Sequence, residues 1–146
     1  MELDLILYTA LISDSQLKEL VGDRIKSTCF EVAPTEQDNV ELPYIIVTDD
    51  GFQNQDSTKD DTWESEEDMV QSSIEISGRS PREVKNLVAL VRKVINRYIN
   101  NLYDEGEDVP ELSSLTSDGL AWDWTKPCYF QTLTYRCFIK TDNDYE

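Results

Sequence analysis

The chain has 146 residues, and 30 Asp and Glu against 13 Lys and Arg give a formal net charge of −17 at pH 7. The electrostatic field of such a chain repels phosphate, which argues against a DNA- or RNA-binding site. The content of 39% hydrophobic and 10% aromatic residues argues against a disordered chain. The absence of histidine removes the usual general base and the commonest zinc ligand, which excludes most hydrolase mechanisms.

The length predicts a single domain over residues 1–146. Three cysteines, Cys29, Cys128 and Cys137, are odd in number and lack a CxxC spacing, which favours reduced, buried thiols over disulfides or a zinc site. The apolar N-terminal stretch ends by Ile12 and is too short to span a bilayer, so no membrane anchor is expected.

Residues 3–21 carry apolar side chains at helical spacing, interrupted at 13–15 by a Ser-Asp-Ser run that can supply a new N-cap. This pattern predicts one broken helix or two short ones, ended by Gly22. Residues 25–32 have the composition of a strand, and a polar, proline-containing loop is expected up to residue 41.

A second strand is predicted over residues 42–48. Tyr44 and Ile46 are apolar like Ile45 and Val47, which indicates a central strand or one that a neighbouring subunit covers. The acidic residues 49–68 are expected to form a long loop or a protruding hairpin. Alternation over residues 70–76 then predicts a half-buried antiparallel strand, with Val70, Ser72, Ile74 and Ile76 on one face.

The sequence Ser-Pro-Arg-Glu at positions 80–83 is a capping box, with a serine N-cap, proline at the first helical position and Glu83 at N3. It predicts a helix whose apolar stripe runs from Val84 to Tyr98. The basic residues on its other side are expected to be solvated or to meet an acidic neighbouring subunit; they are Arg82, Lys85, Arg92, Lys93 and Arg97.

Residues 100–119 have low periodicity and are expected to form an acidic connection. Leu120, Trp122 and Trp124 then alternate in strand fashion, and a last strand is predicted over 129–140 before a frayed tail at 141–146. The resulting fold class is α+β. It is a two-layer sandwich in which an N-terminal helix and a long central helix cover one face of a mainly antiparallel sheet of four to five strands.

No Walker-type or GxGxxG motif is present, so no nucleotide or other cofactor site is predicted. The carboxylates of the acidic segment are dense enough to ligate magnesium or calcium, but they lack an EF-hand spacing, and a solvated charge run is the simpler interpretation. Trp122 and Trp124 have few basic neighbours to support nucleic-acid stacking, which favours core or interface anchors.

Four stretches, at residues 17–25, 42–47, 70–83 and 135–139, together resemble a known family. The first two are similar to its opening helix and strand, the third to its central strand, turn and long helix, and the fourth to its closing strand. The family is that of the tail-completion and tail-terminator proteins of long-tailed bacteriophages and related prophages, which includes lambda's tail terminator and tail-to-head joining proteins. The acidic residues 49–68 and the long connection at 100–119 depart from the family pattern.

The resemblance implies a structural protein without enzymatic activity. It implies a homo-oligomeric ring, commonly six-fold, that caps the finished tail tube and meets the head connector, first in the host bacterial cytoplasm and then in the virion tail. DNA would pass through the ring without specific binding. An acidic channel lining or rim is then expected from Asp49, Asp50, Asp56, Asp60, Asp61, Glu64, Glu66, Glu67 and Asp68, and a subunit interface from Tyr44, Ile46, Trp122 and Trp124.

Two other classes remain open from the residues alone. An acidic inhibitor or DNA mimic would use the −17 charge as a decoy for a basic cleft, although it needs acids laid out like phosphates, and here many lie in two segments. A carboxylate-metal enzyme such as a nuclease would need saturable binding of a divalent cation.

Overall fold

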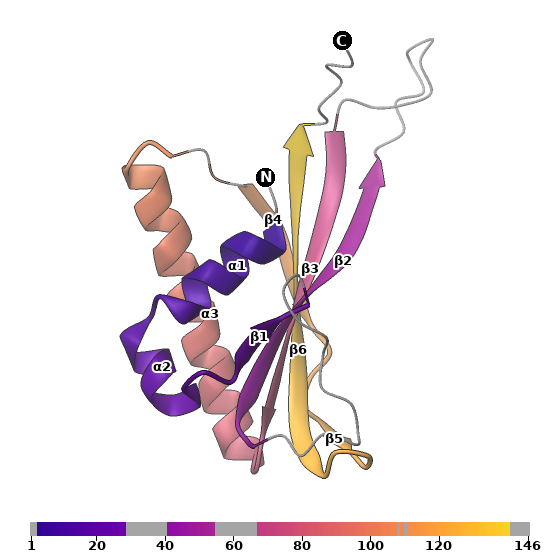
Figure 1. Cartoon of the computed structure of the whole chain (residues 1–146). Helices are drawn as coiled ribbons and strands as arrows, with labels where there is room; N and C mark the ends of the chain where they lie inside the picture. Colours follow the sequence, from indigo (N-terminus) through magenta and orange to yellow (C-terminus); the bar gives the residue numbers. More distant parts are fainter. Residues whose placement is uncertain (1–2, 29–40, 55–66, 108, 110, 141–146) are drawn as a thin grey trace.

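The computed structural model describes residues 3–28, 41–54, 67–107, 109 and 111–140. In chain order, its helices and strands are α1 (Leu3–Ile12), α2 (Ser15–Val21), β1 (Ile25–Ser27), β2 (Tyr44–Asn54), β3 (Glu67–Gly78), α3 (Pro81–Asp104), β4 (Glu111–Ser117), β5 (Ala121–Asp123) and β6 (Cys128–Lys140). The helices pack on one face of the sheet, as Figure 1 shows. The predicted α+β class with helices on one face is confirmed.

The sheet has six strands, one more than the upper limit predicted. Five lie in the order β1-β2-β3-β6-β4, and β5 pairs with the other end of β6. Only the β1–β2 pair is parallel; the pairs β2–β3, β3–β6, β4–β6 and β5–β6 are antiparallel. β2 is therefore an interior strand, which was one of the two alternatives predicted for it.

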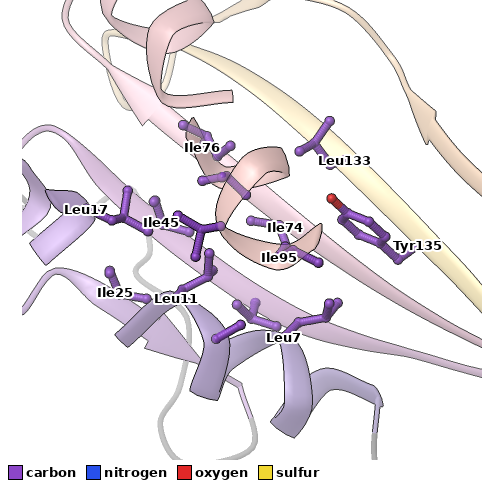
Figure 2. Packing of buried hydrophobic residues seen from close by; sticks show 14 of the residues in the cluster. Leu7, Leu11, Leu17, Ile25, Ile45, Ile74, Ile76, Ile95, Leu133 and Tyr135 are labelled. Atoms are coloured by element: carbon purple, nitrogen blue, oxygen red, sulfur yellow. The ribbon is translucent and has the colours of Figure 1, made fainter. Parts of the chain in front are cut away.

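The core lies between the helices and the three long strands. Leu7 and Leu11 of α1 and Ile95 of α3 face Ile45, Ile74, Leu133 and Tyr135 of the sheet, and Figure 2 shows these side chains together. All seven are at most 2% exposed. Burying each apolar side chain stabilises the fold by roughly 1.5–3 kcal/mol, so this layer is the main source of stability.

The first two helices follow the predicted break. Asp14 is the N-cap of α2, and its Oδ2 accepts a hydrogen bond of 2.8 Å from the Leu17 N–H. Gly22 ends α2 at a φ of 67°, where a side chain would be strained. The break lets α1 and α2 each turn apolar residues, including Leu7 and Leu17, into the same core.

The predicted capping box begins α3, with one difference. The Ser80 Oγ accepts a hydrogen bond of 3.1 Å from the Glu83 N–H, as expected. Glu83 Oε1 accepts a hydrogen bond of 2.7 Å from the N–H of Arg79, one residue before the N-cap. Gly78 leaves room for this arrangement, since a Cβ there would lie 2.9 Å from Glu83 Oε1 and 3.0 Å from Val84 Cγ2.

Two predicted boundaries are corrected, and a third lies outside the described residues. The predicted strand at 25–32 is shorter among the described residues, because β1 ends at Ser27 and residues 29–32 lie outside them. Residues 49–54 and 67–68 belong to the paired strands β2 and β3, which agrees with a protruding hairpin and contradicts a loop over that part. The tail at 141–146 lies outside the described residues.

The predicted acidic connection at 100–119 contains regular structure that its low periodicity did not indicate. α3 continues to Asp104, and β4 then pairs with β6. The register shifts between Leu112 and Ser114, so Leu112 lies opposite Cys137 and Leu115 lies opposite Tyr135 on the core side. Because this irregularity places two leucines three residues apart on one face, strict alternation is absent from the sequence of β4.

We expect Ser80→Ala to lower the free energy of unfolding by about 1 kcal/mol, because the Glu83 N–H loses its acceptor at the start of α3. Urea denaturation of the purified chain measures this change. Ser114→Ala is the matched control, since Ser114 is exposed on β4, and its expected effect is close to zero. Equal effects of the two substitutions would contradict the capping role of Ser80.

Candidate functional site

The three described members of the predicted acidic rim lie where β2 and β3 run past the helices, toward the top of Figure 1. Asp49 and Asp50 are exposed, and Asp68 is half-buried. Asp56, Asp60, Asp61, Glu64 and Glu66 lie outside the described residues, as does the side chain of Glu67.

A β-bulge separates Asp49 from Asp50. Asp49 lies opposite Ser72, and the next paired residue, Phe52, lies opposite Val70, so Asp50 and Gly51 together face Gln71. The Gly51 N–H donates a hydrogen bond of 2.8 Å to Asp49 Oδ1, and its φ of 89° suits glycine. The Ser73 hydroxyl donates to Asp50 Oδ2.

These carboxylates do not form one wall. Asp49 and Asp68 lie opposite Ser72 and Ile139, which belong to the helix-facing side of the sheet. Asp50 bonds to Ser73 on the opposite side. The acidic side chains therefore lie on both faces of the projecting strands.

Two members of the predicted subunit interface are buried within the single chain. Tyr44 and Ile46 are each 3% exposed. Within the single chain they therefore offer almost no surface to a neighbouring subunit, and they match the central strand that was the other predicted alternative.

The other two members, Trp122 and Trp124, lie at the corner between β5 and β6. Trp122 is 37% exposed and packs edge-on against Tyr129, with ring centroids 4.7 Å apart. Trp124 is 86% exposed, and its ring centroid is 5.9 Å from that of Trp122. An exposed aromatic pair of this size is typical of a protein-binding surface.

Trp124 does not share a strand with Trp122, contrary to the predicted alternation. β5 ends at Asp123, whose Oδ1 accepts hydrogen bonds from the Thr125 N–H at 2.9 Å and the Thr125 hydroxyl at 2.6 Å. The hydrogen bond from the Thr125 hydroxyl is the main cause of the lowered pKa of Asp123. This Asx turn ends the strand and leaves Trp124 in the turn.

A polar network on the face away from the helices could not be found in the sequence. Arg136 Nε donates a hydrogen bond of 2.5 Å to Gln71 Oε1, and Nη1 donates one of 3.4 Å to Thr116 Oγ1. Ser73 and Thr134 have hydroxyl oxygens 3.3 Å apart in the next row. These residues are far apart in the sequence, so only the strand register brings them together.

Ionisable groups with raised pKa values lie on both faces of the sheet, with Glu75, Tyr44 and Cys128 on this face and Tyr135 and Cys137 beneath the helices. Burial raises the pKa of Glu75, and the nearby Lys126 opposes that shift. Burial also raises the pKa of Tyr44, Cys128 and Cys137, and it raises that of Tyr135 to about 12. Cys128 and Cys137 are free, buried thiols as predicted, and a protonated thiol is a poor nucleophile. Cys29 lies outside the described residues.

Within the described part of the chain, no group of three or more Cys, Asp and Glu side chains is arranged to hold a metal ion. The densest acidic run in the sequence lies largely outside this part. Among the helices of the same described residues, none has both the length and the apolar character needed to cross a membrane.

Comparisons with known proteins give little further information. No family model matches the chain, and no curated protein matches it significantly. Among solved structures, a chain from the virion of a native gene transfer agent particle is similar at 15% identity, with a TM-score of 0.47 and 95% of each chain covered. Similarity at this level does not assign a function.

We expect the Glu75 carboxyl to make stability depend on pH. Since burial raises its folded pKa above the ordinary 4.5, the folded chain holds this proton more tightly, and stability falls as the pH rises from 4.5 through the folded pKa. Glu75→Gln is therefore expected to be more stable relative to wild type at pH 7 than at about pH 4, measured by urea denaturation.

Thr132→Val is the control for this prediction, because Thr132 lies opposite Glu75 and carries no titratable group. Its effect is expected to be the same at both pH values. If Glu75→Gln also gives the same difference at both pH values, then burial does not perturb this carboxyl.

Proposed function

We propose that this chain is a structural tail-assembly protein of a phage or prophage, of the tail-completion or tail-terminator type, with no enzymatic activity. It would form a homo-oligomeric ring that caps the tail tube and joins it to the head connector. The main support is the strand–turn–helix unit from β3 through the Ser80 cap into α3, which carries the sequence resemblance and folds as the sequence predicts.

The distribution of charge supports the same proposal. Asp49, Asp50 and Asp68 lie on both faces of strands that project past the helices, which fits a rim better than a smooth channel lining. DNA phosphates would be repelled by such a rim, so that a genome would pass without binding.

The buried chemistry is consistent with a structural role. Burial raises the pKa of Cys128 and Cys137, which keeps these thiols unreactive, and the chain contains no histidine to serve as a general base. The sequence resemblance supports the proposed structural role more directly than the lack of a histidine base does.

We expect the purified full-length chain to form closed rings, visible by negative-stain electron microscopy. The particle mass in solution is expected near six times the 16.8 kDa chain, as in the common form of the family. A chain that is monomeric at every concentration and salt tested, including in the presence of tail tubes, contradicts the proposal.

Two further measurements separate the alternative classes. A salt-sensitive complex with a DNA-binding enzyme that competes with DNA, in the absence of rings, would identify an acidic inhibitor or DNA mimic. Saturable heat on titration with magnesium, manganese or calcium would identify a metal-dependent protein instead.

We expect Trp124→Ala to weaken ring formation by roughly 30-fold in dissociation constant, as truncation of a tryptophan anchor in an interface does. Because Trp124 is 86% exposed, the folding stability should change little. Phe52→Ala, at an aromatic residue of β2 that is 72% exposed, is the matched control. Equal ring formation by the two variants would remove Trp124 from the interface.

A further inference from the structure

Positive charge is concentrated on one helix of this acidic protein. Residues 79–97 contain six of the 13 basic residues and one of the 30 acidic residues, so this stretch is net +5 and the rest of the chain is net −22. Five of the six lie on α3, opposite its buried stripe of Val84, Val91 and Ile95, and all five are exposed. We call this surface the basic face; it consists of Arg82, Lys85, Arg92, Lys93 and Arg97.

Ion pairs within the described part of the chain involve only one residue of the basic face. Arg97 Nη1 lies 3.8 Å from Asp14 Oδ1. Among the described residues, the other four basic side chains form no ion pair. Their charge is therefore available to another molecule.

Negative charge gathers just beyond the other end of the same helix. Asp104, Glu105, Glu107 and Glu111 are exposed, and we call these four residues the acidic end. In the part of the chain that the structure describes, none of them forms an ion pair. The last turn of α3 holds Asp104 and no basic residue.

The acidic end is placed where it disfavours folding. The C-terminus of a helix carries partial negative charge, so carboxylates there are repelled and basic residues are preferred. Acids in this position cost stability in the isolated chain. A cationic partner would remove that cost.

The two charged surfaces cannot neutralise each other in one molecule. At 1.5 Å per residue, the nearest members of the two surfaces, Arg97 and Asp104, are roughly 10 Å apart along the helix, which is longer than the ~8 Å Debye length at physiological salt. The two surfaces therefore do not neutralise each other.

We propose that the acidic end of one copy docks on the basic face of α3 in a second copy. Two chains of net charge −17 repel each other at most orientations, and the basic face is where an approaching acidic surface is attracted. The contact joins two different surfaces, and such head-to-tail contacts form a ring when the rotation between successive copies closes. This inference rests on the proposed ring and names the contact that builds it.

Nucleic acid is the competing occupant of a basic face. A polyanion long enough to cover α3 would also meet the acidic end and the net −22 of the remaining chain. It would also leave the acids at the helix C-terminus unexplained. A second copy accounts for both surfaces.

The test uses charge reversal in the full-length chain. Variant one carries Asp104→Lys, Glu107→Lys and Glu111→Lys, and variant two carries Arg82→Glu, Lys85→Glu and Lys93→Glu. Each alone is expected to raise the dissociation constant of self-association by about 10- to 100-fold, measured by analytical ultracentrifugation. Wild-type association is expected to weaken with added salt.

The decisive measurement is made on a mixture of variants one and two. Variant one presents two basic surfaces and variant two presents two acidic ones, so an equimolar mixture is expected to assemble with the two chains alternating. Asp104→Lys places a cation at the end of α3 and Arg82→Glu places an anion at its start, which the helix dipole favours. Lost association with retained thermal stability is therefore not explained by unfolding.

Glu19→Lys, Asp23→Lys and Asp118→Lys together form the matched control, because they are exposed acids elsewhere and change the net charge as variant one does. This control is expected to assemble at least as well as wild type. Rings that persist in variants one and two would overturn this contact and leave the proposed function standing. A wild-type chain that never self-associates would overturn both.

The last measurement is the binding of a labelled DNA duplex by wild type and by variant two. If wild type binds the duplex at physiological salt and variant two does not, the basic face is a nucleic-acid site and the proposal is overturned. Absence of binding by both proteins supports the second copy as the occupant.

Discussion

Burial of one sheet face beneath the helices is the constraint on which the structure depends. Leu7, Leu11 and Ile95 contact the interior of the sheet, and this single layer fixes which side of β2, β3 and β6 is apolar. The opposite face is then free to carry polar rows such as Gln71, Arg136 and Thr116. Because the core uses only the helix-covered part of the long strands, their far ends can project without loss of the fold.

The charge distribution separates the demands of folding from those of assembly. The core cluster consists of apolar side chains and Tyr135, and the acids at the C-terminal end of α3 oppose its dipole. Residues that lower the stability of a single chain are best understood through contacts that a single chain cannot make. The exposed Trp124 belongs to the same category, since its ring adds little to the core.

The sequence predicted features that depend on local spacing. The Ser80 cap, the Asp14 cap and the alternation in β3 and β6 were all readable, because each is set by neighbours within a few residues. β4 was missed because the irregularity between Leu112 and Ser114 hides its alternation. The sequence left open whether the chain itself or a neighbouring subunit buries Tyr44 and Ile46, and the Arg136 network was beyond sequence reasoning, since it arises from pairing between distant strands.

The bulge at Asp50 and Gly51 has a consequence for which changes in length the chain tolerates. Two residues there face one on β3, so the faces exchange along β2 between Asp49 and Phe52. Deleting one residue at this point would remove the bulge, since a single residue would then face Gln71 while Phe52 stayed opposite Val70. The bend that the extra residue gives to β2 would be lost, but Phe52 and Gln53 would keep their faces. The strand can therefore lose one residue here without turning its apolar side away from the helices.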